Sequence, residues 1–472
     1  MVVAMTDGAA LLEILATVAD PEIAAAIAGT IRNGPDRSLC RINALAFAAK
    51  HGFDEERTIS AFLHAGSLGL FDLSWNVLCP GCGGVLDTNA SLKTIMKDEY
   101  VCALCADGYS PTLDELVEVT FTVSPRIRRI AAHNPVELPL SEYLRQLYWG
   151  SGVDVPEDFE AVLDRFVIDT MELAPGEKGA LSLQLPAEFV IIFEVVTHSA
   201  QFIDVQGEPT TERRALSLIY DRDHTHNQML TMRPGPLRLA IENRTGGRVM
   251  PAVLRANDAL HDLLHKRRPF LTAKRLLTNQ TFRDLYRTDT VDVGQRLKIT
   301  SLTFLFTDLR GSTELYERVG DLAAFDLVQD HFRVLHEIVA AEAGAVVKTI
   351  GDAVMATFPT PDRAVAAALR MRKEMDQLNA STGREDLLLK IGLHEGPCIA
   401  VSMNERQDYF GQTVNIAARV QGLADALSIF ATGSVVNDGK SARLLADAKV
   451  NPLPRPVALR GIDRQIEIFT IR

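Results

Sequence analysis

The sequence predicts an α+β protein built from several domains. Its 472 residues exceed what a single hydrophobic core usually organises, so about two to four domains are expected. Helical periodicity dominates the first part, alternating β-branched residues dominate the middle, and the last third mixes both patterns. We therefore expect a helical unit at 1–75, a cysteine-rich ribbon at 76–112, a β-rich, regulatory domain at 113–258, a helical coupling linker at 259–298 and a mixed α+β domain at 299–472.

The composition is that of a folded protein. Hydrophobic residues make up 47% and charged residues 23%, which argues against a largely disordered chain. The net charge of −12 opposes sequence-independent binding to nucleic acid or anionic lipid, so we expect no nucleic acid partner. Acidic residues such as Asp7 and Glu13 interrupt the apolar runs at the amino terminus, and the apolar stretch at 189–196 is less than half of the roughly 20 residues that span a bilayer. We expect a cytoplasmic protein without a signal peptide or transmembrane segment.

Helical signals run from residue 9 to residue 75. Apolar positions between 39 and 48 and the segment HGFDEERTISAFLHAGSLGLFDL suit two amphipathic helices, and Gly52 marks the break between them. A helix pair joined by a short glycine turn fits a small winged-helix-like unit that binds DNA or protein. It also describes many structural helical hairpins, and this second interpretation leads.

Four of the six cysteines form two C-x-x-C pairs. Cys79-Pro-Gly-Cys82 and Cys102-Ala-Leu-Cys105 have the spacing of a four-thiolate zinc ribbon, in which each pair forms one tight knuckle on a tetrahedral ion. Four protein ligands leave no open position for a substrate, so the predicted zinc site is structural. The two other cysteines stand alone, and we expect no structural disulfide.

Alternating, β-branched segments punctuated by Pro, Gly and Asn fill the middle of the chain. LVEVTFTV, GALSLQL, FVIIFEVVTH, LSLIY and PLRLAIENRT predict strands without a catalytic constellation. The pairs His224/His226 and His261/His265 have a spacing that suits a metal, but neither has a third ligand in an obvious place, so solvated or capping histidines are favoured. Residues 259–288 combine helical periodicity with basic patches, as a coupling linker would.

Three segments of the last domain carry polar residues at informative places. In FTDLRGST, an alternating strand ends at Asp308, where a carboxylate can leave the sheet and face a ligand. VVKTIGDAVMATF predicts a β-hairpin with Asp352 at its tip and Lys348 on the incoming strand. DYFGQTVNIAAR begins at Asp408 and enters a helix near Gly411.

A helix is expected between the first two segments, from about residue 321 to residue 343. Gly344 ends it. Its predicted apolar face consists of Leu322, Phe325, Val328, Phe332, Leu335 and Ile338.

The residue types of the three segments suit phosphate chemistry. Two carboxylates that converge on one place repel each other unless a cation lies between them, and hard oxygen ligands favour Mg2+ or Mn2+. Asn415 and Arg419 lie four residues apart, so both project from one face of the predicted helix, where arginine can stabilise charge on phosphorus. Each feature alone has an ordinary explanation, either a turn dipeptide or a solvated polar stripe. Their joint occurrence favours a nucleotide site.

Together the three segments closely resemble the catalytic domain of class III nucleotidyl cyclases, over about residues 299–472. The resemblance implies a ferredoxin-like βαββαβ fold. In that family two aspartates bind two Mg2+ or Mn2+ ions per active site, a lysine and an aspartate read adenine, and an asparagine and an arginine stabilise the transition state. By resemblance these roles carry over to Asp308 and Asp352, to Lys348 and Asp408, and to Asn415 and Arg419.

The resemblance implies an adenylate cyclase, a phosphorus-oxygen lyase that converts ATP to 3′,5′-cyclic AMP and pyrophosphate in intracellular signalling. An aspartate accepts from the exocyclic amine of adenine while a lysine donates to ring N1, which favours ATP over GTP. Where relatives often carry a Lys-Gly-Lys-Gly run, this chain has Arg460, and then Arg464, as candidates for the triphosphate contact. Family sites form between two catalytic domains, so a chain with one such domain implies a homodimer with two equivalent sites.

The amino-terminal arrangement also resembles an uncharacterised regulatory module found before some bacterial cyclase domains. That resemblance supplies no ligand, so we expect a regulatory ligand or protein partner of unknown identity. The alternative to an enzyme is a catalytically weak, cyclase-like nucleotide sensor attached to a DNA- or protein-binding amino-terminal module. The complete set of catalytic residue types favours catalysis.

Overall fold

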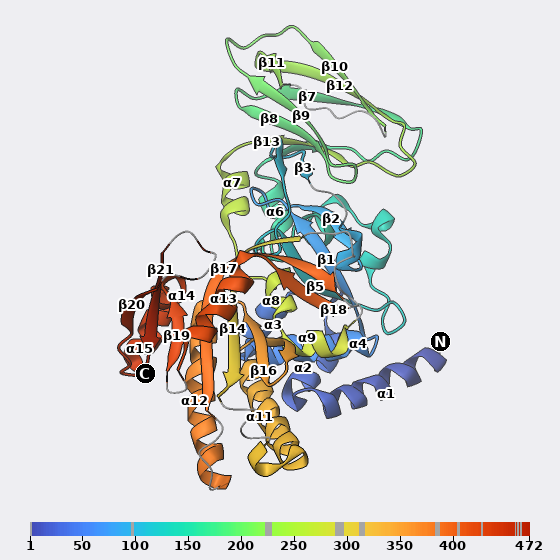
Figure 1. Ribbon diagram of the computed structural model, residues 1–472. Coiled ribbons are helices and arrows are strands. Elements are labelled where there is room, and N and C mark those ends of the chain that lie inside the picture. Colours follow the sequence, from blue (N-terminus) through green and yellow to red (C-terminus); the bar gives the residue numbers. More distant parts are fainter. Residues whose placement is uncertain are drawn as a thin grey trace. The chain divides into compact units, whose positions relative to one another are not determined.

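The chain folds into two compact units, each described here by itself (Figure 1). The amino-terminal unit comprises Met1–Ala90, Lys97–Pro111 and Leu116–Leu271, and the carboxyl-terminal unit comprises Ser91–Met96, Thr112–Glu115 and Thr272–Arg472. The finer five-part division expected from the sequence stays a prediction. The computed structural model describes residues 2–95, 99–221, 229–287, 297–310, 317–382, 388–403, 406–425, 428–457, 459, 462 and 465–472.

Four α-helices open the amino-terminal unit, as the sequence predicts. Side-chain caps begin three of them: Asp20, Asn43 and Asp54 each accept from backbone amides of the following turn. Gly52 ends the third with a left-handed φ of 71°, which a residue with a Cβ would adopt at a cost. The helical region ends sooner than residue 75, because a strand already begins at Phe71. The helices are α1 (Val2–Val18), α2 (Pro21–Asn33), α3 (Ala44–His51) and α4 (Glu55–Ser67), with the short η1 (Asp36–Leu39) after α2.

Two small antiparallel elements follow the helices. Strands β1 (Phe71–Leu78), β2 (Val85–Asn89) and β5 (Val117–Val123) form a sheet in the order β2-β1-β5. Strands β3 (Tyr100–Cys102) and β4 (Asp107–Tyr109) form a separate hairpin. The predicted strand LVEVTFTV is therefore β5. Short helical turns lie nearby or follow: η2 (Leu92–Thr94), η3 (Ala131–His133), η4 (Pro135–Glu137), α5 (Leu140–Tyr143), η5 (Leu144–Tyr148) and α6 (Phe159–Leu163).

The β-rich region expected in the middle of the chain consists of two sheets. One has the order β11-β9-β8-β13-β6 and the other the order β10-β12-β7. Buried residues of both sheets, including Ile192, Ile203 and Leu239, share one hydrophobic core. The strands are β6 (Val167–Thr170), β7 (Lys178–Leu185), β8 (Phe189–Glu194), β9 (Ser199–Val205), β10 (Arg214–Tyr220), β11 (Met229–Met232), β12 (Gly235–Asn243) and β13 (Pro251–Arg255).

The carboxyl-terminal unit is built on one mixed sheet in the order β15-β16-β14-β17-β19-β21-β20, with β18 also paired to β17. The predicted hairpin is present, with Gly351 and Asp352 between its strands. The elements are β14 (Leu297–Leu309), α11 (Asp321–Ala341), β15 (Ala345–Ile350), β16 (Ala353–Phe358), α12 (Pro361–Thr382), β17 (Leu389–Met403), β18 (Arg406–Phe410), α13 (Gln412–Leu423), β19 (Ile429–Thr432), α14 (Gly433–Val436), α15 (Gly439–Asp447), β20 (Leu453–Val457) and β21 (Ile466–Ile471).

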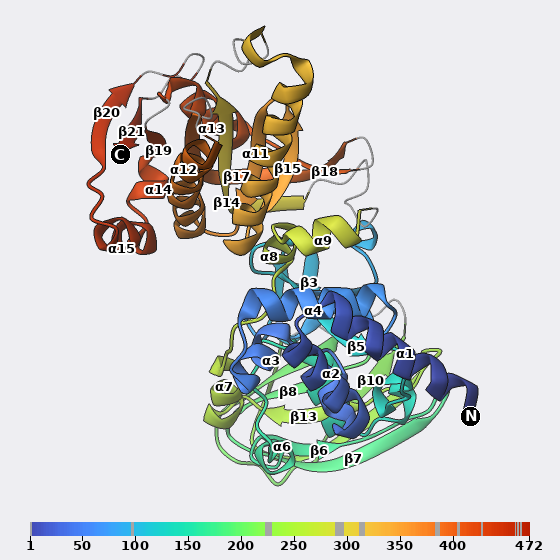
Figure 2. The same ribbon diagram turned by 90° about the horizontal axis from the view of Figure 1, so that it is seen from below.

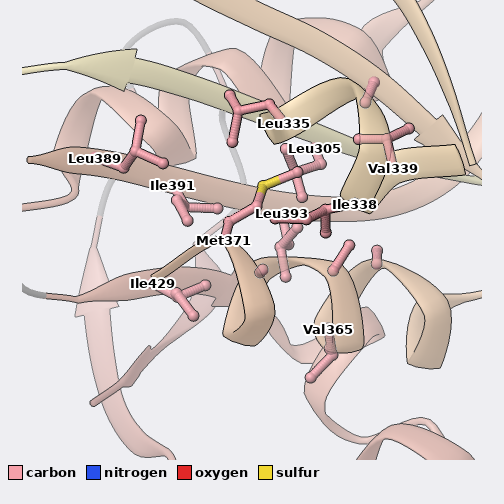
Figure 3. Packing of buried hydrophobic residues seen from close by; sticks show 14 of the residues in the cluster. Leu305, Leu335, Ile338, Val339, Val365, Met371, Leu389, Ile391, Leu393 and Ile429 are labelled. Atoms are coloured by element: carbon pink, nitrogen blue, oxygen red, sulfur yellow. The ribbon is translucent and has the colours of Figure 1, made fainter. Parts of the chain in front are cut away.

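Helices cover both faces of this sheet. Figure 3 shows the core of one face, where Met371 of α12 lies among Leu335 of α11 and Leu305 and Ile391 of the sheet. The opposite face packs against α13 through residues such as Val420. Side chains alternate along a strand. Because Leu305 and Leu309 of β14 belong to the first core, Asp308 between them faces the side of α13.

The predicted apolar face of α11 is partly wrong. Leu322 and Phe325 are 85% and 56% exposed, whereas Val328, Leu335 and Ile338 are buried as expected. Leu322 and Ile338 are 16 residues apart, which at about 100° per residue places them about 160° apart around the helix. The face that packs on the sheet consists of Ala324, Val328, His331, Leu335, Ile338 and Val339.

The predicted linker contains three short helices: α7 (Asp258–His265), α8 (Ala273–Leu277) and α9 (Gln280–Leu285). Helices α8 and α9 belong to the carboxyl-terminal unit and are visible in Figure 2. Lys274 of α8 forms an ion pair of 3.0 Å with Asp114 and donates to the carbonyl of Ser301 in β14 at 2.9 Å. Within the described ranges, no helix combines the length and the apolar character that crossing a bilayer requires.

Candidate active site

Asp308 and Asp352 lie close enough to interact. Asp308 precedes the last residue of β14, and Asp352 follows Gly351, whose φ of 63° forms the tight turn of the hairpin. Partial burial and the negative charge of Asp352 both raise the pKa of Asp308. One carboxylate oxygen of Asp352, Oδ2, is buried without a hydrogen-bond partner among the described residues. Two adjacent carboxylates with an unsatisfied oxygen are a donor set that suits a hard divalent cation.

Three neighbours of these carboxylates were not found from the sequence. Lys390 is the cross-strand partner of Asp308, with its Nζ 3.7 Å from Oδ2 of Asp308. The side-chain amide of Gln421 in α13 donates to Asp308. His331 of α11 is fully buried next to Asp352, and burial lowers the pKa of its ring to about 4, so the ring is neutral at pH 7. Strand register and helix docking bring these residues together, and no local motif signals them.

Lys348 and Asp408 form a direct pair. The Nζ of Lys348 in β15 lies 2.5 Å from Oδ2 of Asp408 in β18. The lysine side chain is 45% exposed and the aspartate side chain 12% exposed, so the pair lies at the surface with its acid partly covered. Oδ1 of Asp408 accepts from the backbone amide of Tyr409 at 2.8 Å, which fixes the carboxylate. The pair offers one donor and one acceptor side by side.

Asn415 and Arg419 project from the exposed face of α13. The opposite face of the helix is buried, and its first turn is held by Thr413, which donates to the carbonyl of Pro397 at 2.5 Å. A Cβ at Gly392 of β17 would lie 2.2 Å from the backbone nitrogen of Gln421, so α13 approaches the sheet as closely as glycine allows. Among the residues whose placement is known, neither Asn415 nor Arg419 has a hydrogen-bond or ion-pair partner. Both side chains are available to another molecule.

The structure thus arranges the six predicted residues as one carboxylate pair, one lysine–aspartate pair and one exposed asparagine–arginine pair. Arg460 and Arg464, the candidates for the triphosphate contact, lie outside the described residues.

The four cysteines of the C-x-x-C pairs converge, with their sulfur atoms all within 4.8 Å of one another. Sγ of Cys79 and Sγ of Cys105 are 3.6 Å apart, as are those of Cys82 and Cys102. Zinc–sulfur bonds of about 2.3 Å in a tetrahedron require sulfur separations of about 3.8 Å. The cluster therefore fits a tetrahedral metal ion.

The histidine pairs give no further site. His224 and His226 lie outside the described residues. Nδ1 of His265 is 2.7 Å from the carbonyl oxygen of His261, so this pair is engaged at the end of α7 in the way of a capping side chain. In the described part of the chain, the cysteine cluster is the single group of three or more His, Cys, Asp or Glu side chains gathered tightly enough to hold a metal.

A mixed sheet with paired aspartates and an asparagine–arginine helix defines a nucleotidyl cyclase domain, and residues 295–466 match the adenylate and guanylate cyclase catalytic domain. Residues 5–284 match a family of unknown function (DUF5939). Because this second match covers more than half of the chain, the protein belongs to that family and combines its module with a cyclase catalytic domain.

Relatives of this chain match it over different lengths. An uncharacterized protein of Mycobacterium tuberculosis is 26% identical over 322 residues, which are 68% of this chain and 71% of the relative. An adenylate cyclase of Anabaena cylindrica is 28% identical over 186 residues, and the chain spans 36% of that relative's length as well as 36% of its own. The crystal structure of the adenylyl cyclase CyaB from P. aeruginosa aligns with a TM-score of 0.33 and 25% identity over 38% of this chain and 96% of that one.

Proposed function

We propose that the protein is an adenylate cyclase that converts ATP to 3′,5′-cyclic AMP and pyrophosphate at the interface of a homodimer. The observation that carries the proposal is the Lys348–Asp408 pair, because it presents a donor and an acceptor side by side on the unit that also holds the two aspartates. The family description covers both adenylate and guanylate cyclases, so the choice between ATP and GTP must come from the residues that contact the base.

Asp308 and Asp352 would hold two Mg2+ or Mn2+ ions. When bound, the ions would lower the pKa of the ribose 3′-hydroxyl and neutralise the triphosphate. The two carboxylates relieve their mutual repulsion by binding cations, and Lys390 would be displaced from Asp308 or would contact a phosphate oxygen. The unsatisfied Oδ2 of Asp352 supports this assignment.

Lys348 and Asp408 would read the base. The carboxylate of Asp408 accepts from the exocyclic N6 amine of adenine, and the ammonium group of Lys348 donates to N1. Guanine has an acceptor where adenine has its N6 donor, and a donor where adenine has its N1 acceptor. Asp408 would therefore face an acceptor and Lys348 a donor. Without nucleotide the two residues neutralise each other, and adenine would exchange that contact for two hydrogen bonds.

Asn415 and Arg419 would act on the ATP held by the aspartates of a partner copy. Asn415 would orient the ribose and Arg419 would stabilise the charge that develops on the α-phosphate, while Arg460 is proposed to contact the triphosphate. The exposure of both α13 residues supports a site shared between two copies. Apolar side chains close in sequence to the site residues are exposed as well, namely Ile350, Met403 and Phe410. Two copies related by a twofold axis would form two equivalent sites.

The amino-terminal module would regulate the enzyme, and the cysteine cluster would hold structural Zn2+. Four thiolates leave no open coordination position, so the ion would stabilise the fold around it. That fold includes Tyr148, whose hydroxyl lies 3.7 Å from the sulfur of Cys82, and the aromatic core near it. The regulatory ligand or protein stays unassigned.

Product analysis tests the proposal. The purified chain with Mn2+ and ATP should release cyclic AMP and pyrophosphate in equal amounts, and with GTP it should release much less cyclic nucleotide. Replacing Lys348 by Glu together with Asp408 by Cys should reverse this preference, because both hydrogen-bonding edges change. If no nucleoside triphosphate is cyclised but ATP still binds, the nucleotide-sensor alternative replaces the enzyme.

A further inference from the structure

Helix α9, which lies at the end of the region matched by the family of unknown function, contacts the two strands that carry Lys348 and Asp408. Its cap residue Asn279 accepts from the amide of Phe282 at 3.1 Å, and Phe282 is buried, so the helix is anchored in the carboxyl-terminal unit. In this position, Gln280 and Arg283 contact strand β15 of the carboxyl-terminal sheet.

Arg283 connects the residues that immediately precede the lysine and the aspartate. One nitrogen of its guanidinium group, Nη2, donates to the carbonyl of Val347 at 3.2 Å and to the carbonyl of Gln407 at 3.0 Å. Val347 precedes Lys348 in β15, and Gln407 precedes Asp408 in β18. Strands β15 and β18 share no ladder in the sheet, since β15 pairs with β16 and β18 pairs with β17. One side chain therefore bridges the backbones of two strands that do not pair directly with each other.

Gln280, one turn earlier in α9, supports strand β15 just before Lys348. The register of β15 against β16 shifts between Val346 and Lys348, which is a β-bulge that redirects the following side chain. Oε1 of Gln280 accepts from the amide of Val346 at 2.8 Å, and its own amide donates to Asp284 at 3.0 Å, which fixes its orientation. Strand β15 lies at the edge of the sheet, so Gln280 supplies an acceptor to a backbone amide on its open side.

A third contact ties the other side of Asp408 to the linker. The hydroxyl of the buried Tyr409 donates to the carbonyl of Leu277 in α8 at 3.4 Å and accepts from the side chain of Gln407 at 3.0 Å. The residues on both sides of Asp408 are thus held by the α8–α9 segment, Gln407 through its carbonyl and Tyr409 through its hydroxyl.

We propose that Arg283, assisted by Gln280, is a positioning residue that sets the distance between Lys348 and Asp408 and so tunes nucleotide affinity and base selectivity. The inference rests on the proposed function, because it concerns the pair assigned to adenine. It also gives the amino-terminal family a defined output: a displacement of α9 changes base recognition, while the aspartates on β14 and the hairpin turn are not contacted by Arg283.

The test compares full-length variants that differ in these two hydrogen bonds. Arg283→Gln removes both, Arg283→Lys keeps one donor, and Arg287→Gln is the matched control. Arg287 borders the same cavity of about 190 Å³ beside α9 and carries the same charge, but makes no contact with either carbonyl. The cavity also gives the substituted side chains room, so the fold should survive.

For Arg283→Gln we expect KM for ATP to rise about tenfold with kcat changed less than about threefold, and the preference for ATP over GTP to fall, because two modest hydrogen bonds are lost. Arg283→Lys should recover part of the effect, and Arg287→Gln should match the parent chain. A loss of kcat alone, a lowered melting temperature with unchanged selectivity, or an equal effect of Arg287→Gln would overturn the inference. Equilibrium binding of ATP and GTP, measured alongside turnover, separates this result from a failure of the proposed cyclase activity.

Discussion

Asp308 and Asp352 are held together against their mutual repulsion. Burial and the neighbouring carboxylate raise the pKa of Asp308, and the contacts with Lys390 and Gln421 offset only part of this effect. A raised carboxylate pKa means that the folded state binds this proton more tightly than the unfolded state does. Stability is therefore lost as pH rises from the unfolded pKa through the folded pKa.

Replacing Asp308 by Asn should accordingly stabilise the metal-free protein while it abolishes turnover. In EDTA at pH 7 we expect the variant to melt at a higher temperature than the parent, with the difference shrinking toward pH 4. Cyclase activity should fall by at least about a thousandfold, because a proposed metal ligand is lost. Thermal unfolding with EDTA and with Mn2+ measures both the gain and the loss of metal-dependent stabilisation.

Asp326→Asn is the matched control, because Asp326 is an exposed aspartate of α11. It should leave melting temperature, pH dependence and activity close to those of the parent. An Asp308→Asn variant that is less stable than the parent in EDTA would contradict the repulsion.

Short motifs predict individual residues of this site, but the contacts between those residues depend on how the strands and helices pack. The strand-end position of Asp308 and the hairpin-tip position of Asp352 follow from local pattern, and the structure places them there. Lys390 and Gln421 could not be predicted, because one depends on the register of β14 against β17 and the other on how closely α13 approaches Gly392. The catalytic roles of the six motif residues stay predictions that the experiments above address.

Elements with strong local signals were predicted well. The hairpin of β15 and β16 and the start of α13 after Gly411 match the sequence analysis. The inward face of α11 was less predictable, because a list of apolar residues spaced by three and four drifts around a helix when it is followed too far. The membership of residues 112–115 in the carboxyl-terminal unit had no local signal at all, since it comes from long-range contacts such as the amide of Leu113 donating to the carbonyl of Lys298.

The ion pair between Asp114 and Lys274 should be one of the strong contacts of that unit. The carboxylate of Asp114 is 5% exposed and also accepts from the amide of Thr300 at 2.5 Å. Asp114→Ala should therefore destabilise the carboxyl-terminal unit by about 3 kcal/mol, because it leaves a mostly buried ammonium group and a backbone amide without their partner. Urea unfolding measures the change.

Arg333→Ala provides the contrast, because it breaks an exposed pair with Glu337 on the surface of α11. Its cost should stay below about 0.5 kcal/mol. Equal effects of the two substitutions would mean that residues 112–115 contribute little to the unit.

The cysteine cluster joins β1, β2 and β3 to the aromatic core around Tyr148 and Trp149. Cys82→Ser should remove about one zinc ion per chain and destabilise the amino-terminal unit by several kcal/mol, since four ligands act together. Elemental analysis and urea unfolding measure the two effects. Cys40→Ser is the control, because Cys40 lies outside the cluster and should change neither. A parent protein that folds normally without bound metal would refute the assignment.

At the scale of the whole molecule, the carboxyl-terminal unit exposes large apolar side chains near the proposed site. Phe410 is 67% exposed and Met403 is 54% exposed, both on the β17–β18 hairpin next to α13. Exposed aromatic and methionine side chains beside unpaired functional residues are typical of an interface. The homodimer was proposed from the family resemblance, and the exposure of Asn415 and Arg419 supports that proposal.

A shared site predicts that two inactive variants restore each other. Asp308→Asn removes a proposed metal ligand and Arg419→Ala removes the group proposed to stabilise the transition state, so each homodimer should be inactive. In an equal mixture of exchanged subunits about half of the dimers pair the two variants, and each of these has one intact site of two, so activity should return to about a quarter of the parent value. Mixing Asp308→Asn with Asp352→Asn is the control: both changes lie on the metal side, every site is defective, and no activity should return. If the first mixture stays inactive after verified subunit exchange, each site is built within one chain.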